Sequence, residues 1–454
     1  MNIINPATEE IIASIQEDEL TGLRAKYQLL RSHQSIWNAV PLTERIIIIQ
    51  LFADLLKQNI ESLASTLTAE MGKPLQQSRN EINGAANRVG WLAQHASKYL
   101  SEEVMTLDDH LIEKIVYEPL GVICNISAWN YPYNVGVNVF IPALLAGNAV
   151  MYKPSEYSVL TGLKIEQYLK QAGVPDEVFQ VAIGGGEVGN QLLDFPFNGY
   201  YFTGSFKTGK HIYERVAAKM VPCQLELGGK DPVYITDDIE DVKSAAASVA
   251  DGAFYNNGQS CCAVERIYVH ESIYDTFIKE FVEEVKSWKL GSPDISGTYI
   301  SVLSRPGQVT FLEDQVSDAI LKGATVLTGG KKIDSTGYYF EPTILVNVNH
   351  TMDLMKEESF GPVIGIMKVK NDDEAIRLMN DTEYGLTAAV YSKSLQRAQP
   401  IFDQMNTGTV YWNCCDRVSP SVPWSGRKQS GFGSTLSHQG LRAFTQPKAY
   451  HLRS

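Results

Sequence analysis

Residues 119–152 read PLGVICNISAWNYPYNVGVNVFIPALLAGNAVMY, a stretch without a single charged side chain. The stretch is long enough to suggest a membrane span. Five asparagines and the prolines Pro132 and Pro142 interrupt it, however, and unpaired amides in hydrocarbon would cost several kcal/mol. We therefore expect a buried strand, a loop and a buried helix inside a globular domain, and no membrane partner.

Similar short apolar segments follow along the chain, and helical segments separate most of them. The first series of expected strands lies at residues 121–128, 149–155, 178–183, 200–205 and 232–236. The second lies at residues 265–273, 324–330, 363–369, 388–392 and 408–413, with helices at 274–289 and 372–379. This alternation is typical of parallel βαβ units with buried strands. We predict an α/β fold of two units that meet near Gly228 and Gly229.

The N-terminal part is rich in helix, with amphipathic spacing at residues 43–59 and a second helix at 81–100. The chain has 454 residues, about three times the length of a common single domain, so we expect two or three packed units.

The overall composition narrows the possible functions. The 52 acidic residues outnumber the 39 basic ones, and this excess repels a phosphate backbone, so we expect no nucleic-acid partner. No CxxC or HxxxH spacing indicates a metal site. No basic residue precedes Arg24, which argues against a secretory or mitochondrial signal and favours the cytoplasm.

Two segments carry residues suited to catalysis. FYNNGQSCCAVER (254–266) places paired cysteines before a strand, where a thiolate could attack a carbonyl carbon. The alternative is that both cysteines are small buried residues. In QLELGGKDP (224–232), Glu226 is either a general base or a salt-bridged turn carboxylate.

Three further segments follow expected strands. In ISAWNYPYN (126–134), Asn130 is either an oxyanion donor or a turn residue. YKPSEYS (152–158) lies at a strand end, where α/β sheets bind ligands. AIGGGEVGN (182–190) is a glycine-rich turn, which alone is poor evidence for a dinucleotide site.

Taken together, these motifs resemble the NAD(P)-dependent aldehyde dehydrogenase superfamily over essentially the whole chain. The most specific are FxNxGQxC, which ends at Cys261, and ELGGK, which begins at Glu226. The others are AWNYP, KPSE, FTGS (202–205), EESFGPV (357–363) and PWSGRKQSGFG (423–433).

The resemblance implies a role for each matching residue. Cys261 matches the nucleophile and Cys262 its non-catalytic neighbour. Glu226 matches the general base, and Asn130 matches the oxyanion donor that works with the Cys261 amide. The residues that match cofactor contacts are Lys153 and Glu156 at the adenosine ribose, Gly204 and Ser205 near the pyrophosphate, and Glu358 and Phe360 at the nicotinamide ribose and ring. NAD is the expected cofactor, with weaker use of NADP, because the Glu156 carboxylate would repel a 2′-phosphate.

The resemblance also implies an architecture. A Rossmann-variant NAD-binding domain would comprise residues 1–100 and 120–228, and an α/β catalytic domain residues 229–428. A small oligomerisation arm and tail would comprise residues 101–119 and 429–454. We expect a homo-oligomer, either a dimer or a tetramer, in which strands within 104–120 and 443–452 extend a neighbour's sheet.

The substrate follows less directly from the resemblance. Tyr131, Tyr255 and Trp424 match positions where betaine-aldehyde and aminoaldehyde dehydrogenases form an aromatic box for a cation, although ordinary tunnel residues would explain them too. Succinate-semialdehyde dehydrogenases share the SHxG element (437–440), but many carry arginines at positions 138 and 255, which are absent here. These comparisons favour a cationic or neutral aldehyde over an acidic one.

Some positions depart from the family pattern. Asn138 and Val139 replace a frequent Trp-Lys pair, Ser425 replaces a glycine, and His438 replaces a glutamate. Two functions from other classes remain as alternatives. A cysteine esterase without redox chemistry could use Cys261, but the cofactor motifs would then have no purpose. A non-catalytic structural protein is opposed by the intact nucleophile and base.

Overall fold

The apolar stretch forms the centre of a parallel sheet in the computed structural model, which describes residues 1–454. It folds into strand β5 (Val122–Ile126), a loop, the buried helix α5 (Pro132–Leu145) and strand β6 (Ala149–Lys153), as predicted. The sheet order is β19-β9-β8-β5-β6-β7, and only β19 is antiparallel. Its other strands are β7 (Phe179–Val181), β8 (Gly199–Thr203), β9 (Cys223–Glu226) and β19 (Gly431–Phe432).

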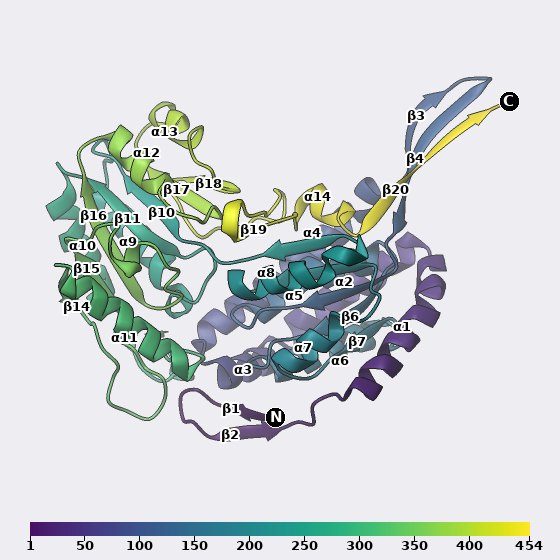
Figure 1. Cartoon of the computed structure of the whole chain (residues 1–454), viewed down its shortest axis with the longest axis horizontal. Helices are drawn as coiled ribbons and strands as arrows, with labels where there is room; N and C mark the ends of the chain where they lie inside the picture. The colour runs from purple at the N-terminus through teal and green to yellow at the C-terminus, as the bar shows by residue number, and fades with distance from the viewer.

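Helices from the N-terminal half surround this first sheet and share one apolar core with it. They are α1 (Leu20–Ala39), α2 (Leu42–Gln58), α3 (Ile60–Met71), α4 (Leu75–Leu100), α6 (Val159–Ala172), α7 (Gly186–Leu192) and α8 (Phe206–Val216). The short strands β1 (Asn2–Ile4) and β2 (Ile11–Ser14) form a separate hairpin near the N-terminus (Figure 1).

A second sheet has the order β14-β15-β16-β11-β10-β17-β18, and all its pairs are parallel except β14 with β15. Its strands are β10 (Asp231–Ile235), β11 (Val264–His270), β14 (Thr325–Thr328), β15 (Thr343–Val346), β16 (Val363–Val369), β17 (Thr387–Tyr391) and β18 (Thr409–Trp412). Two very short strands, β12 (Lys289–Leu290) and β13 (Thr298–Ile300), pair apart from it.

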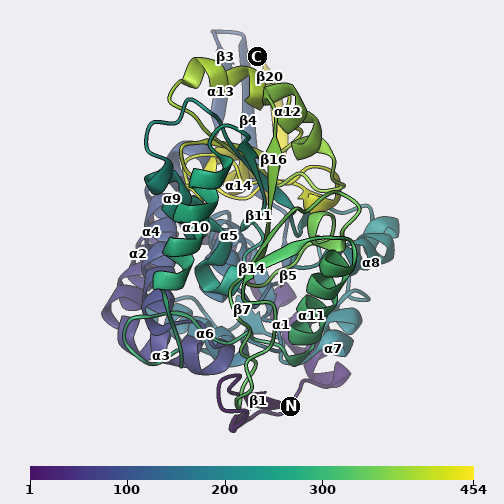
Figure 2. The ribbon, with the colours of Figure 1, turned by 90° about the vertical axis from the view of Figure 1, so that its left-hand side faces the viewer.

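Helices cover both faces of the second sheet. The helices α9 (Val242–Phe254) and α10 (Tyr274–Ser287) pack on one face. The helices α11 (Pro306–Leu321), α12 (Asp372–Asn380) and α13 (Leu395–Phe402) pack on the other. Figure 2 shows α9 and α10 on one side of the strands and α11 on the other. The α/β prediction is therefore confirmed. One assignment differs: the strand predicted at 232–236 as the last of the first series is β10 of the second sheet, because the chain has already crossed between the sheets at residues 227–230.

Several predicted boundaries were wrong by two residues or more. The strand predicted to reach residue 155 ends at Lys153, since Pro154 has no N–H to donate. The strand predicted to reach residue 273 ends at His270, where a turn leads into α10. Helix α4 begins earlier than predicted because its first turns bury polar side chains, Gln77 and Ser78 among them, which hide the apolar periodicity.

A three-stranded arm extends from the body of the molecule (Figure 1). Its strands are β3 (Glu103–Leu107), β4 (Leu111–Pro119) and β20 (Thr445–Arg453), which follows the short helix α14 (Ser437–Arg442). Strand β20 pairs antiparallel with β4 of its own chain, so β3 and β20 form the two outer edges. The oligomer, and the division of the chain into domains, stay predictions.

None of the helices combines the length and apolar character needed to cross a bilayer.

The chain passes from the first sheet to the second through residues 227–230, between the end of β9 and the start of β10. Strand β19 returns from the C-terminal part to pair with β9, with Gly431 opposite Glu226. This crossing brings segments from both sheets and from the C-terminal region to one place.

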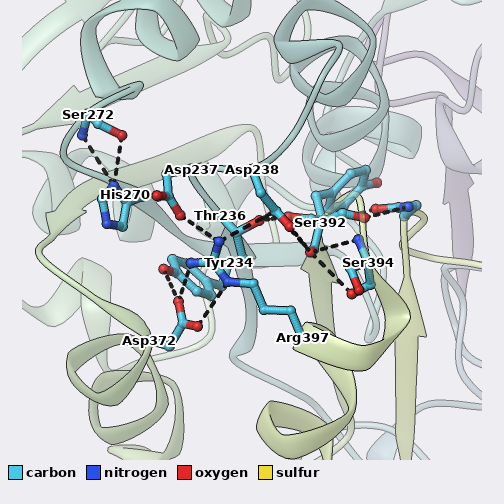
Figure 3. A network of polar contacts seen from close by, with 12 residues as sticks. Tyr234, Thr236, Asp237, Asp238, His270, Ser272, Asp372, Ser392, Ser394 and Arg397 are labelled. Atoms are coloured by element: carbon cyan, nitrogen blue, oxygen red, sulfur yellow. Dashed lines mark hydrogen bonds and ion pairs between the residues drawn. The ribbon is translucent and has the colours of Figure 1, made fainter.

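A polar network ties together the far ends of the second sheet's strands (Figure 3). Arg397 of α13 donates to Asp372 over 2.7 Å and pairs with Asp237 over 2.6 Å. The Tyr234 hydroxyl also donates to Asp372, over 2.7 Å. Burial alone would raise the pKa of Asp237 and Asp372, but the hydrogen bonds from Arg397 hold both below their ordinary value.

We predict that Arg397→Ala destabilises the fold by about 2 kcal/mol at neutral pH, because two carboxylates lose a charged donor. The lowered pKa values mean that wild type gains this stability above about pH 4 and loses it as the carboxylates protonate. The difference in unfolding midpoint between wild type and variant should therefore shrink below that pH. Lys393→Ala, which removes an exposed pair with Glu240, is the control and should change little. An equal effect of both variants at every pH would contradict this account.

Candidate active site

A cavity of about 520 Å³ lies where the two sheets meet. Its lining includes all nine residues predicted for catalysis and cofactor binding: Asn130, Lys153, Glu156, Gly204, Ser205, Glu226, Cys261, Glu358 and Phe360. Tyr131, Tyr255 and Trp424, predicted to contact the substrate, do not line it. The structure thus brings together residues that are more than two hundred positions apart in the chain.

The loop that carries Cys261 is held in an unusual backbone conformation. Asn256 and Asn257 both have a φ of 56°, and Gly258 has a φ of 70°. Asparagine and glycine tolerate this left-handed region better than other residues. The Asn257 side chain accepts from the Ser301 N–H over 2.7 Å and donates to the Val302 carbonyl over 2.8 Å. These side-chain bonds fix the loop, so Asn257 has a structural role that its motif position did not indicate.

The two adjacent cysteines have different surroundings. Cys261 is half-buried and lines the cavity. Cys262 is buried, packs against Leu386 and Trp424, and donates its thiol hydrogen to Asp416 Oδ1 over 2.9 Å. A hydrogen bond with the Cys261 thiol and burial raise the pKa of Cys262. Cys261 is therefore the thiol that can reach a ligand.

Asn130 lies in the loop after β5 and is buried. Its side-chain Nδ2 donates to the Gln259 carbonyl over 3.1 Å, which points the amide toward the cysteine loop. Its backbone carbonyl accepts from Lys73 Nζ over 2.8 Å and from Asn256 Nδ2 over 3.2 Å. An amide nitrogen here can donate a hydrogen bond to an oxygen beside Cys261.

A buried ion pair supports the Asn130 loop from the helical region. Lys73 Nζ binds the Glu81 carboxylate, and both side chains are completely shielded from solvent. The second Glu81 oxygen accepts from the Tyr133 N–H over 2.9 Å. Sequence reasoning missed both residues, because nothing in their local pattern indicates that they meet a loop fifty residues away.

Glu226 ends strand β9 and is buried. Thr435 Oγ1 donates to its carboxylate, and Gln224 Nε2 donates over 3.3 Å. Burial raises the pKa of Glu226 to about 7, although both hydrogen bonds oppose this shift. A carboxyl group with this pKa can take up and release a proton near neutral pH. Thr435 was not predicted; it lies three residues after β19, the strand that pairs with β9.

The glycines of ELGGK allow two other segments to approach. A Cβ at Gly228 would lie 2.2 Å from a Glu358 carboxylate oxygen, and one at Gly229 would lie 2.6 Å from the Cys261 carbonyl. The Gly229 N–H donates to Glu358 over 3.0 Å. Burial, followed by the charge of Glu265, raises the pKa of Glu358 to about 8.

The lysine of the same motif fixes the Glu358 loop. Lys230 Nζ pairs with Glu265 over 2.5 Å and donates to Ser359 Oγ over 3.1 Å, and it is fully buried. Glu265 in turn accepts from the backbone N–H groups of Ser359 and Phe360, each over 3.0 Å. Lys230 and Glu265 therefore position the loop that carries Glu358 and Phe360.

The opposite end of the cavity is suited to a dinucleotide. Gly204 and Ser205 precede α8, and the Ser205 hydroxyl accepts from the Thr208 N–H, so the helix N-terminus begins at the cavity wall. Unpaired N–H groups and the helix dipole favour a phosphate at such a position. Lys153 and Glu156, whose charged atoms are 3.9 Å apart, line the same end. Gly186 and Gly189 of the glycine-rich turn also line it, a role that sequence reasoning left open.

The three aromatic residues have partners within the chain. The Tyr131 ring lies under Lys73 Nζ, 3.8 Å from the ring centre. The Tyr255 hydroxyl accepts from Asn80 over 3.0 Å, and its ring meets Tyr299 edge-on. Trp424 is buried in the small cluster around Cys262.

Two of the positions that depart from the family pattern also have defined surroundings. His438 is exposed and its ring lies 5.5 Å from that of Tyr99, away from the cavity lining. Asn138 is buried and accepts from Arg88 Nη1 over 3.3 Å. Arg88 of α4 therefore contacts Asn138, although residue 138 itself is not an arginine.

Comparison with known proteins agrees with this geometry. The model of the aldehyde dehydrogenase family matches residues 1–450. The chain is similar to succinate-semialdehyde dehydrogenase [NADP(+)] of Deinococcus radiodurans, with 32% identity over 98% of this chain and 93% of that protein. It is similar to betaine aldehyde dehydrogenase of Bacillus subtilis, with 33% identity over 98% of this chain and 93% of that protein. The crystal structure of betaine aldehyde dehydrogenase from Staphylococcus aureus in complex with NAD+ has a TM-score of 0.95 and 32% identity, covering 100% of this chain and 92% of that chain.

The fold, the site and these comparisons thus define an oxidoreductase with a cysteine in the lining of a nucleotide-sized cavity. The chain belongs to the aldehyde dehydrogenase family.

We predict that the two cysteines differ in reactivity. Because Cys261 faces the cavity while Cys262 is buried and bound to Asp416, iodoacetamide should alkylate Cys261 first, as peptide mass mapping would show. Cys261→Ala should lower aldehyde oxidation roughly a thousandfold or more, and Cys262→Ala should keep most of the activity. An active Cys261→Ala enzyme beside an inactive Cys262→Ala enzyme would reverse the assignment.

Proposed function

We propose that the protein oxidises an aldehyde to its carboxylate, with Cys261 as nucleophile, Asn130 as oxyanion donor and Glu226 as general base. The observation that carries the proposal is that these three residues line one cavity together with the residues predicted to bind the cofactor. The α8 N-terminus, Lys153 and Glu358 fit the phosphate and ribose groups of NAD(P) chemically.

In the first half of the proposed reaction, the Cys261 thiolate adds to the aldehyde carbon and forms a thiohemiacetal. Asn130 Nδ2 and the Cys261 backbone N–H donate to the oxygen that becomes negative, and one such donor is typically worth about 3 kcal/mol of barrier. When bound, the nicotinamide supplies an acceptor for the hydride that leaves the carbon. The product on Cys261 is then a thioester.

In the second half, Glu226 removes a proton from a water molecule, and the resulting hydroxide attacks the thioester carbon. The carbon–sulfur bond then breaks. The carboxylate product departs, and Cys261 is again a thiolate. With its pKa raised to about 7, Glu226 binds this proton firmly enough to activate water and still releases it to solvent at neutral pH. The hydrogen bonds from Thr435 and Gln224 orient the carboxylate.

The esterase alternative gains little support from the site. It would use Cys261 and Glu226, but it would leave the Glu358 loop and the α8 end of the cavity without a purpose. Reduction of NAD+ during aldehyde turnover, followed by absorbance, separates the two functions. Ester cleavage without any aldehyde-dependent reduction would favour the esterase.

Similarity to named relatives does not decide the substrate, because the two dehydrogenases named above are 33% and 32% identical to this chain. The aromatic residues expected to receive a cation have other partners, and Lys73 already covers one face of the Tyr131 ring. This arrangement weakens the argument for betaine aldehyde or an aminoaldehyde and leaves an acidic aldehyde such as succinate semialdehyde as a serious candidate.

We also propose that the chain forms a dimer or tetramer through its arm. The arm ends in two sheet edges, and Val104, Met105 and Leu107 on β3 are exposed. Free edges and exposed apolar side chains are commonly covered by a partner. The cytoplasmic location remains an expectation from the sequence.

We predict that Glu226→Gln produces one burst of reduced cofactor and then stalls. Hydride transfer precedes the step that needs the base, so the burst should persist while steady-state turnover falls roughly 100-fold or more. Rapid-mixing absorbance measurements distinguish the two phases. Steady-state turnover equal to that of wild type would mean that another group activates the water.

We predict that NAD is preferred over NADP and that Glu156→Gln raises kcat/KM for NADP about tenfold, since it removes a negative charge that would face the 2′-phosphate. Glu187→Gln is a matched control on α7, because Glu187 is exposed and does not line the cavity. Wild-type efficiency with NADP equal to or above that with NAD would contradict the role assigned to Glu156.

A further inference from the structure

Arg88 is a cation for which the chain supplies no ion-pair partner. It lies on α4, and its Nη1 donates to Asn138 Oδ1 over 3.3 Å. This is the only hydrogen bond that its side chain makes within the protein, and no carboxylate lies within ion-pair distance. Nε and Nη2 are not among the buried unpaired nitrogens, so they remain accessible to solvent or to a ligand.

Arg88 is also close to the reacting groups. Burial lowers its pKa, and the charges of Cys262, Glu81, Glu226 and Cys261 raise it in turn. Even so, a guanidinium stays protonated at any physiological pH. The side chain thus presents a positive charge near Cys261 and Glu226, although it is not among the residues that line the 520 Å³ cavity.

The carboxylates around Arg88 are engaged with other groups. Glu81 is paired with Lys73, and Glu226 accepts from Thr435 and Gln224. Asp416 accepts a hydrogen bond from the Cys262 thiol. A deeply placed cation without a counter-ion is costly, and a bound anion would offset that cost.

A cationic substrate would find a less favourable environment. Lys73 Nζ lies 3.8 Å from the centre of the Tyr131 ring and occupies one of its two faces, so an ammonium group could use only the other. Arg88 adds a second positive charge to the same region. A carboxylate, in contrast, can accept two parallel hydrogen bonds from the fork of Nε and Nη2.

We propose that Arg88 is a specificity-determining residue that binds a carboxylate at the far end of the substrate, so that the enzyme prefers aldehydes carrying an acid group. The inference rests on the proposed function, since it assumes that Cys261 attacks the aldehyde end. Asn138 assists by holding Nη1, which leaves the other two donors directed at the ligand.

The test compares three probes in NAD+ reduction: succinate semialdehyde, butanal and betaine aldehyde, which carry an acid, a neutral and a cationic end. The variants are Arg88→Gln and Arg88→Lys, with Arg79→Gln as the matched control on α4, because Arg79 makes only surface contacts, with Glu61 and Gln76. Wild type should use succinate semialdehyde at least about tenfold better than butanal in kcat/KM.

Arg88→Gln should lower kcat/KM for succinate semialdehyde about 100-fold, chiefly through KM, and should affect butanal far less. Arg88→Lys should recover part of the loss, since it restores the charge without the planar fork. Arg79→Gln should behave as wild type with all three probes.

Two results would overturn the inference. One is an equal loss for succinate semialdehyde and butanal in Arg88→Gln, which would indicate a structural role. The other is a wild-type preference for betaine aldehyde or butanal. In both cases aldehyde oxidation itself would stand. Failure of all three probes to reduce NAD+ would instead overturn the proposed function, and this inference with it.

Discussion

The active site depends on three glycines at which close neighbours leave no room for a side chain. A Cβ at Gly228 would meet the Glu358 carboxylate at 2.2 Å, and one at Gly229 would meet the Cys261 carbonyl at 2.6 Å. A Cβ at Gly258 would meet the Gly361 carbonyl at 2.3 Å. Because these contacts join the turn between the sheets, the cysteine loop and the Glu358 loop, they set the relative positions of the groups that would react.

Buried charges then hold these segments in register. Lys230 with Glu265 fixes the loop that carries Glu358, and Lys73 with Glu81 fixes the loop that carries Asn130. Breaking such a pair leaves an uncompensated charge in the interior and is far more damaging than breaking an exposed one. Arg88 differs from these lysines because the chain provides no carboxylate for it, which is why a ligand is the expected partner.

Sequence alone predicted the strands that are apolar on both faces, since an uninterrupted run such as residues 122–126 has few other stable arrangements. The resemblance to a known family also named nine residues that all line the cavity, because its motifs could be matched residue by residue. Both failed where a residue acts through a contact that is distant in sequence. Lys73 and Thr435 are ordinary polar residues in their own segments, and only the folded chain brings them to Asn130 and Glu226.

The prediction of substrate-binding residues from sequence shows the same limit more strongly. Residues 138 and 255 were judged by their identity, and neither is an arginine. The packing of α4 against α5 nevertheless places the guanidinium of Arg88 beside Asn138. A charged side chain can thus come from a neighbouring helix and not from the position where relatives carry it. Comparing the sequence with a family position by position does not detect such a replacement.

The close backbone contacts are tested most directly by kcat/KM for an aldehyde in Gly258→Ala, compared with Gly307→Ala. A methyl group at Gly258 must displace the Gly361 carbonyl, whereas one at Gly307 meets nothing within 4 Å. Displacing catalytic groups by about 1 Å can cost roughly 100-fold in rate. We predict a loss of that size in Gly258→Ala, with a native circular dichroism spectrum, and wild-type efficiency in Gly307→Ala. Wild-type efficiency in Gly258→Ala would contradict the account.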